Sequence, residues 1–114
     1  MEAQVFGTVI EIDESFTSYS REPIKQQLRE YLEGSRTSFD IAIDYPDSFT
    51  GKVMRELAKI PYGETVTYGE LSSRLNSSAI AVGQACGRNP IPVILPCHRV
   101  VAENGLGGFQ YPGL

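Results

Sequence analysis

Residues 67–87 read TYGELSSRLNSSAIAVGQACG, and this stretch predicts the fold of the second half of the chain. Thr67 followed three residues later by Glu70 has the spacing of a capping box, so a helix is expected to begin after Thr67. The polar residues 76–78 form a short turn and cap another helix, expected from about Ala79 to Gly87. Two short helices joined by a tight polar turn are typical of a helix-turn-helix.

The expected helix over residues 79–87 consists almost entirely of small side chains. Such a helix can pack tightly on a core, and it can also approach another large surface closely, such as a groove of DNA. Ile80, near its N-terminal end, is the one bulky side chain that we expect to be exposed. The sequence supports both interpretations.

Further upstream, Phe49, Val53, Leu57 and Ile60 recur at helical spacing. Ser48 or Thr50 supplies the N-cap, and residues 61–63 (Pro-Tyr-Gly) end the helix.

The first 47 residues predict a small sheet covered by one helix. Residues 4–12 alternate as a strand does, and residues 39–43 predict a second strand that Pro46 ends. Between them, residues 23–32 predict a helix with proline near its start and Gly34 as its C-cap. The fold class is therefore α+β, with a small N-terminal lobe over residues 1–47 and a second domain over residues 48–114.

Length and composition exclude several classes of protein. The chain has 114 residues, which suits one compact domain or a small domain with a lobe attached. It contains no apolar run of the about 20 residues that a membrane span needs, and its acidic N-terminus differs from a signal peptide. A soluble intracellular protein without membrane contact is therefore expected.

The net charge of −4 is unevenly distributed along the chain. Residues 1–49 hold four Lys/Arg and ten Asp/Glu, whereas residues 50–100 hold six Lys/Arg and three Asp/Glu. Short helices can scatter charge in this way by chance. The alternative is a mildly basic binding half carried beside an acidic scaffold.

Residues 89–101 read NPIPVILPCHRVV and contain the candidate reactive residues of the chain. Three prolines are expected to hold the apolar run in a fixed extended path. At its end Cys97 precedes His98, the only histidine, and two cysteines with one histidine cannot supply a four-ligand zinc site. A lone buried cysteine is usually inert packing. Here a water could bridge the two side chains, with imidazole as base and thiolate as nucleophile.

With these motifs, residues 48–110 resemble the 6-O-alkylguanine-DNA alkyltransferases, also called methylated-DNA–protein-cysteine methyltransferases. The resemblance rests on GETVTY at 63–68, AVG at 81–83, NPIP at 89–92, PCHRV at 96–100 and GGF at 107–109. It implies a winged helix-turn-helix that binds double-stranded DNA in the minor groove and flips the damaged guanine into a pocket. The protein would then take the alkyl group irreversibly, as a monomer and without a cofactor or metal.

The resemblance also implies the substrates and the location of the protein. The substrate would be 6-O-alkylguanine in DNA, with 4-O-alkylthymine as a further candidate. The protein would be cytoplasmic and associated with the nucleoid through DNA, or nuclear if the source is eukaryotic.

Roles for individual residues follow from the same resemblance. Cys97 would accept the alkyl group, and His98 would draw off its proton through water. Asn89 would brace the turn between the recognition helix and the active site, and Tyr68 would help to rotate the nucleotide and donate a proton to the departing guanine. Further DNA contacts would be Thr50, Ala79, Ile80, Gly83 and Arg88, and pocket residues would be Val100, Gln110 and Tyr111.

The sequence departs from the family pattern at three places. Ile80 stands where the family usually has an arginine that fills the gap left by the flipped base, so an apolar wedge is expected instead. The family continues into another helix whose glutamate hydrogen-bonds the histidine. The present sequence ends at Leu114, so that helix is expected to be absent and His98 to be a weaker base. The N-terminal lobe also lacks the metal ligands that some relatives carry there.

Two alternatives to alkyl transfer are a non-catalytic lesion-binding protein related to the alkyltransferases and a general helix-turn-helix regulator. Non-catalytic relatives normally replace the acceptor cysteine, so Cys97 favours transfer, whereas Ile80 and the missing glutamate favour lesion binding. A general regulator would leave the Pro-Cys-His-Arg run unexplained.

Overall fold

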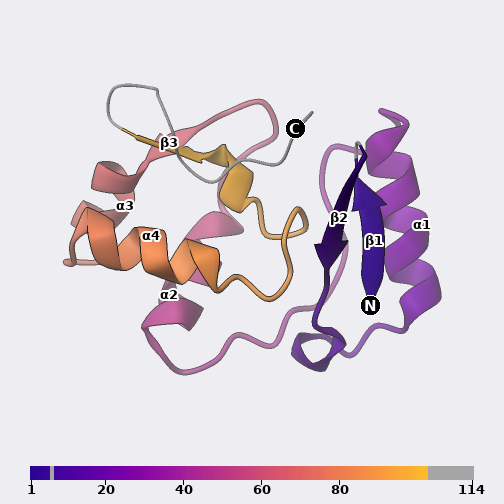
Figure 1. The fold of residues 1–114 in the computed structure, drawn as a ribbon, viewed down its shortest axis with the longest axis horizontal. Helices are drawn as coiled ribbons and strands as arrows, with labels where there is room; N and C mark the ends of the chain where they lie inside the picture. The colour runs from indigo at the N-terminus through magenta and orange to yellow at the C-terminus, as the bar shows by residue number, and fades with distance from the viewer. Residues whose placement is uncertain (6, 103–114) are drawn as a thin grey trace.

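The computed structural model describes residues 1–5 and 7–102, and its elements form two groups side by side (Figure 1). Strands β1 and β2 and helix α1 lie within residues 1–47, which are called the N-terminal lobe below. Helices α2, α3 and α4 and strands β3 and β4 belong to the part that begins at residue 48. The bounds are β1 Glu2–Val5, β2 Thr8–Glu11, η1 Glu14–Phe16, α1 Arg21–Leu32, α2 Phe49–Leu57, β3 Val66–Thr67, α3 Tyr68–Arg74, α4 Ala79–Gly87, η2 Cys97–Arg99 and β4 Val100–Val101.

The predicted single strand over residues 4–12 is wrong, because this segment folds back on itself. β1 and β2 pair as an antiparallel hairpin in which Glu2 lies opposite Glu11 and Val5 lies opposite Thr8. Gly7 adopts a φ of +79°, a conformation that glycine reaches without steric cost and that a tight hairpin turn requires. The alternating pattern is divided by Gly7 into two short strands.

Helix α1 confirms the predicted helix, although it begins at Arg21, two residues earlier than predicted. It packs on the hairpin through its buried Ile24 and Leu28. At its C-terminus Gly34 has a φ of +82°, and its amide donates to the carbonyl of Tyr31 at 3.2 Å. The amide of Ser35 reaches the carbonyl of Glu30 at 2.9 Å, which completes a Schellman motif and confirms Gly34 as the residue that ends the helix.

The predicted strand over residues 39–43 is also wrong. The segment is extended but joins no sheet, and its one ladder contact is a bridge between Thr17 and Ile43. The side-chain amide of Gln27 takes the place of a neighbouring strand. Its Nε2 donates to the carbonyl of Asp40 at 2.9 Å, and its Oε1 accepts from the Asp40 amide at 2.8 Å. A side chain thus satisfies the backbone groups that a ladder would otherwise pair.

Helix α2 confirms the predicted helix at its start, where the Ser48 hydroxyl accepts a hydrogen bond from the amide of Gly51 at 3.2 Å. The helix ends at Leu57, before Pro61. Gly51 lies directly against Pro46, and a Cβ at this position would overlap the Pro46 carbonyl oxygen. The chain can therefore enter α2 at this angle only because residue 51 has no side chain.

The predicted helix-turn-helix is present as α3 and α4, which pack on each other. Thr67 caps α3 by accepting from the amide of Glu70 at 3.0 Å, and Ser78 caps α4 by accepting from the amide of Ala81 at 3.1 Å. In the turn between the helices Asn76 adopts a φ of +53°, which asparagine tolerates better than most residues. β3 and β4 pair in parallel beside the helices.

The prediction of an extended path for the proline-rich run is wrong. The amide of Leu95 donates back to the carbonyl of Ile91 at 3.0 Å, and Val93 between them has a φ of +72°. This tight loop inserts Ile91, Val93 and Ile94 into the core of the N-terminal lobe, against Ile12 and Ile24. A β-branched residue rarely adopts positive φ, so the burial of Val93 must offset backbone strain.

Candidate active site

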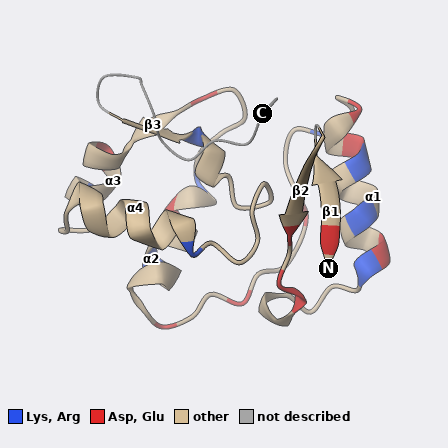
Figure 2. Ribbon diagram, in the orientation of Figure 1, with Lys and Arg blue, Asp and Glu red and all other residues tan. Residues whose placement is uncertain are grey.

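Helix α4 has an exposed outer face that lacks charged side chains. Val82, Ala85 and Cys86 point into the core, whereas Ala79 and Ile80 are exposed, Ile80 at 75% of its surface. The helix carries no charged side chain along its length, and Arg88 follows directly after its end (Figure 2). The exposure predicted for Ile80 is confirmed.

Tyr68, Gly83 and Thr50 lie on three different helices of this half. Tyr68 is the first residue of α3 and is half-buried. A Cβ built on Gly83 of α4 would lie 3.9 Å from Cε1 of Tyr68, so the ring lies close to the small-residue face of α4. Thr50 is half-buried in the first turn of α2.

The Asn89 side chain holds the loop between α4 and the cysteine. Its Oδ1 accepts from the amide of Ile91 at 3.0 Å, and its Nδ2 donates to the carbonyl of Leu95 at 2.8 Å. The first of these is the local side-chain bond typical of asparagine in turns. Together they link both sides of the loop that leads into Cys97.

Cys97 opens the short helix η2 and is fully buried, with none of its surface exposed. Its amide donates to the carbonyl of Leu95 at 2.9 Å. The side chain belongs to the core of the second half, together with Cys86, Val82 and the predicted pocket residue Val100.

His98 is half-buried beside Cys97, and its Nδ1 is buried without a hydrogen-bond partner among the described residues. Burial, with a smaller effect from the nearby charge of Arg99, lowers the pKa of His98 to about 4. The imidazole is therefore neutral at physiological pH. A neutral ring can accept a proton, as a general base must.

Cys86 is the second buried thiol, and its position next to the site was not predicted. Burial, with a smaller effect from Cys97, raises the pKa of Cys86 to about 12. Cys86 therefore remains a thiol and behaves as a small apolar side chain of α4. The spacing of residues 86 and 97 in the sequence gave no sign that the two would share one core.

Arg99 also has contacts that the sequence did not reveal. Its guanidinium reaches the carbonyl of Ile60 and the hydroxyl of Tyr31, and Tyr31 belongs to the N-terminal lobe. The predicted pocket residues Gln110 and Tyr111 lie outside the described residues. Over residues 1–5 and 7–102, no group of three or more His, Cys, Asp or Glu side chains is placed to hold a metal ion. None of the helices described there is long and apolar enough to cross a bilayer.

Comparison with known proteins agrees with this geometry. Residues 48–114 match the family model described as 6-O-methylguanine DNA methyltransferase, DNA binding domain. The chain belongs to this family. A methylated-DNA–protein-cysteine methyltransferase of Archaeoglobus fulgidus is 41% identical over 107 residues, which cover 91% of this chain and 68% of that protein. One from Methanocaldococcus vulcanius is 56% identical over 72 residues, which cover 60% of this chain and 45% of that protein.

Solved structures of family members share the fold. The crystal structure of the Mycobacterium tuberculosis O6-methylguanine methyltransferase matches with a TM-score of 0.69 and 42% identity, over 76% of this chain and 55% of that one. A structure of the M. tuberculosis protein OGT in complex with DNA matches with a TM-score of 0.69 and 35% identity, over 79% of this chain and 64% of that one. The present chain spans about half to two thirds of the length of these relatives.

Proposed function

We propose that this protein repairs DNA by transferring the alkyl group of 6-O-alkylguanine to Sγ of its own Cys97. One observation carries the proposal: the fully buried Cys97 directly precedes a histidine whose neutral form is favoured. The names of the relatives support the same reaction, and 4-O-alkylthymine is proposed as a second substrate.

The proposed reaction is a single displacement. Neutral His98 takes the thiol proton through an intervening water, and the sulfur attacks the alkyl carbon of the flipped base. The sulfur–carbon bond forms as the bond between that carbon and the guanine oxygen breaks. The departing guanine receives a proton from Tyr68. Because the thioether is stable, each molecule reacts once and no cofactor takes part.

The proposed DNA surface is the outer face of α4 with the adjoining ends of α2 and α3. The small residues Ala79 and Gly83 allow the backbone of α4 to approach the minor groove of duplex DNA, and Ile80 projects from the same end. Thr50, Tyr68 and Arg88 would contact the phosphate backbone beside it. The proposed protein acts as a monomer, since one copy of α4 occupies one lesion.

The test is an intact-mass measurement after incubation with a duplex oligonucleotide that contains one 6-O-methylguanine. The proposal predicts a gain of one methyl group per molecule, lost in Cys97→Ala and retained in Cys86→Ala. Cys86 is a matched control because it is an equally buried cysteine of the same core. A methyl group found on Cys86, or on neither cysteine, would contradict the assignment of Cys97.

The second candidate function is lesion binding without transfer. It is favoured by the buried Nδ1 of His98, which lacks a partner among the described residues, since an unoriented imidazole is a poorer base. Tight binding to the 6-O-methylguanine duplex over the unmodified duplex, with no change in protein mass, would support this function and exclude the first.

A further inference from the structure

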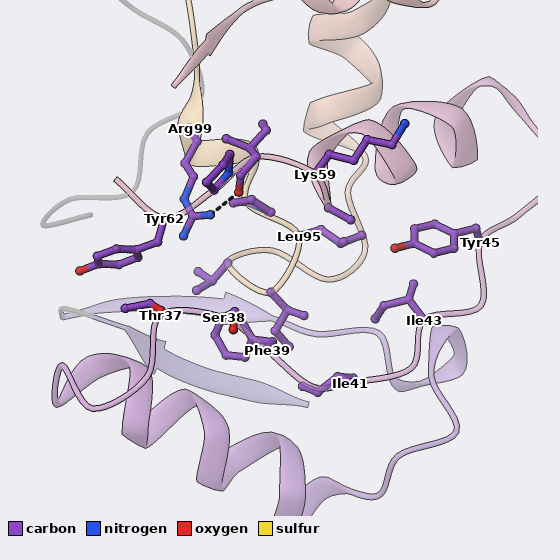
Figure 3. A pocket seen from close by; sticks show the side chains of 16 residues that line it. Thr37, Ser38, Phe39, Ile41, Ile43, Tyr45, Lys59, Tyr62, Leu95 and Arg99 are labelled. Atoms are coloured by element: carbon purple, nitrogen blue, oxygen red, sulfur yellow. Dashed lines mark hydrogen bonds between the residues drawn. The ribbon is translucent and has the colours of Figure 1, made fainter. Parts of the chain in front are cut away.

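The guanidinium of Arg99 joins three segments that are far apart in the sequence. Arg99 lies in η2, the same short helix as Cys97 and His98. Its Nη1 donates to the carbonyl of Ile60 at 2.8 Å, and its Nη2 donates to the hydroxyl of Tyr31 on α1 at 3.4 Å. The first bond is short and the second is long, so the Ile60 carbonyl is the firmer anchor. Figure 3 shows this anchor as a dashed line at the edge of a cavity between the lobes.

One aromatic ring contacts the same guanidinium, and further rings pack behind it. Its carbon lies 5.6 Å from the ring centre of Tyr62, within the range of a cation–π contact. Tyr62 in turn packs edge-on against Tyr31 at 6.0 Å, and Tyr31 packs on Phe39 at 5.1 Å. Arg99 thus contacts Ile60 and Tyr62 in one loop of the second half directly, and it reaches the N-terminal lobe through the hydroxyl of Tyr31.

A cavity beside Arg99 lies between η2 and the N-terminal lobe, and the contacts of Arg99 cross it. It has a volume of about 280 Å³ and separates residues 37–45 of the N-terminal lobe from Pro96 and Arg99 (Figure 3). Close packing is missing at Pro96 and Arg99, whereas the preceding residues Ile91, Val93 and Ile94 pack in the core of the lobe. The polar and aromatic contacts of Arg99 therefore bridge a gap that apolar packing leaves open.

We propose that Arg99 is a positioning residue that fixes the Cys97–His98 segment against Ile60 and Tyr31, so that the N-terminal lobe sets the reactivity of the site. This inference rests on the proposed alkyl transfer for its kinetic test. The lobe then has a function in the reaction although it contributes no group that touches the substrate. The aromatic cluster at Tyr31 is the part of the lobe that transmits this effect.

The charge of Arg99 has a second, separable effect on the site. Among the described residues, Arg99 is the one charged group that shifts the pKa of His98. Among the described residues no carboxylate forms an ion pair with it. Arginine variants can therefore separate the hydrogen-bonding role of the side chain from its charge.

The kinetic experiment compares Arg99→Lys and Arg99→Gln in single-turnover reactions with the 6-O-methylguanine duplex, from pH 5 to 8. Lysine keeps the charge but loses the two-point contact, so its rate should fall about tenfold while the pH profile stays flat. Glutamine removes the charge, which is the smaller of the two causes of the lowered pKa, so the pKa of His98 should rise above about 4 and the rate should begin to fall at a higher pH than in Arg99→Lys. Arg21→Gln, an exposed arginine of the N-terminal lobe, controls for the loss of one positive charge.

A wild-type rate in Arg99→Lys would overturn the positioning role. A pH profile in Arg99→Gln that matches that of Arg99→Lys would overturn the charge effect on His98. A reduced melting temperature with unchanged rates would show that Arg99 has a structural role only.

Hydrogen exchange tests the contact between Arg99 and Tyr31 even if the protein transfers no alkyl group. Tyr31→Phe removes only the hydroxyl and keeps the aromatic packing, and Tyr19→Phe is its control, since the Tyr19 hydroxyl has no hydrogen bond to a described residue. The amides of Cys97 and Arg99, which bond to Leu95 and Pro96, should exchange about threefold faster in Tyr31→Phe than in Tyr19→Phe. Equal exchange in the two variants would overturn the link through Tyr31, whatever the outcome of the mass measurement.

Discussion

Asn89 and Cys97 share one hydrogen-bond acceptor, the carbonyl oxygen of Leu95. The side-chain Nδ2 of Asn89 donates to it at 2.8 Å and the backbone amide of Cys97 donates to it at 2.9 Å. The end of α4 and the start of η2 are therefore fixed to the same atom. A displacement of the Asn89 side chain should therefore also displace the backbone of Cys97.

Replacing Asn89 by aspartate should destabilise the fold and slow alkyl transfer together. The carboxylate has the same shape but donates no hydrogen bond, so it would place a negative charge against the Leu95 carbonyl. We expect the free energy of unfolding to fall by about 2 kcal/mol, measured by urea denaturation. The transfer rate should fall about tenfold.

Asn76→Asp is the control for Asn89→Asp, because Asn76 lies in an exposed turn and its change carries the same added charge. If both variants lost the same stability, the Leu95 carbonyl would have no special role. A fully active Asn89→Asp protein would refute the coupling to Cys97.

Two helical glycines should respond in opposite ways to alanine. In Gly51→Ala the new methyl group would overlap the Pro46 carbonyl oxygen, which must move, so we expect a loss of at least about 2 kcal/mol in unfolding free energy. In Gly83→Ala the methyl group would be in ordinary contact with Tyr68, and alanine favours the helix, so stability should be unchanged or rise by up to about 1 kcal/mol. Thermal and urea denaturation of both variants check the contrast.

Gly83→Ala also tests the proposed DNA face. If α4 approaches the minor groove at Gly83, this stable variant should bind duplex DNA more weakly than the wild type, measured by fluorescence anisotropy. Unchanged affinity would remove Gly83 from the interface while leaving the stability prediction intact.

The helices could be predicted from the sequence because their signals are local. Ser48, Thr67 and Ser78 each cap the helix that follows, and Gly34 ends α1 as expected. A cap depends on residues three or four positions apart, so tertiary contacts seldom override it. The cysteine motif was recognised for the same reason, since its residues are consecutive.

The errors concern segments whose conformation depends on distant partners. Residues 39–43 alternate as a strand does, but the side chain of Gln27 occupies the place of a neighbouring strand. The proline-rich run is predicted to be extended, yet Val93 adopts a positive φ because its side chain packs in the core of the N-terminal lobe. The Arg99–Tyr31 contact spans 68 residues, and no pattern of spacing predicts it.

The burial of His98 should make stability depend on pH. Its pKa is about 4 in the folded protein and near 6.5 when unfolded, so the unfolded state binds more protons between these values. Stability from the neutral ring is fully present above about pH 6.5 and is lost as the pH falls toward 4. Urea denaturation of wild type and His98→Gln should be measured from pH 4 to 7. Between pH 7 and pH 4 the free energy of unfolding should fall by about 2 kcal/mol more in the wild type than in the variant.

His98→Gln is a suitable reference because the carboxylates of Glu14 and Glu30, whose pKa values are lowered by their hydrogen bonds, titrate in both proteins and cancel. Parallel stability curves for the two proteins would mean that the imidazole has the same pKa in the folded and unfolded states, which would contradict the lowered pKa of His98.

Ile80 should limit the repair of duplex DNA more than the reaction with a free base. It is exposed over 75% of its surface at the first turn of α4, where the proposed wedge enters the base stack. An isoleucine can fill the space left by a flipped base, but it offers neither charge nor hydrogen bonds to the orphaned partner. Ile80→Arg should therefore accelerate transfer from a duplex about tenfold and leave the reaction with free 6-O-alkylguanine unchanged.

Because added positive charge alone strengthens DNA binding, Gln84→Arg on the same exposed helix is the control. An equal gain in both arginine variants, or an equal effect on duplex and free base, would show that residue 80 takes no part in flipping the nucleotide.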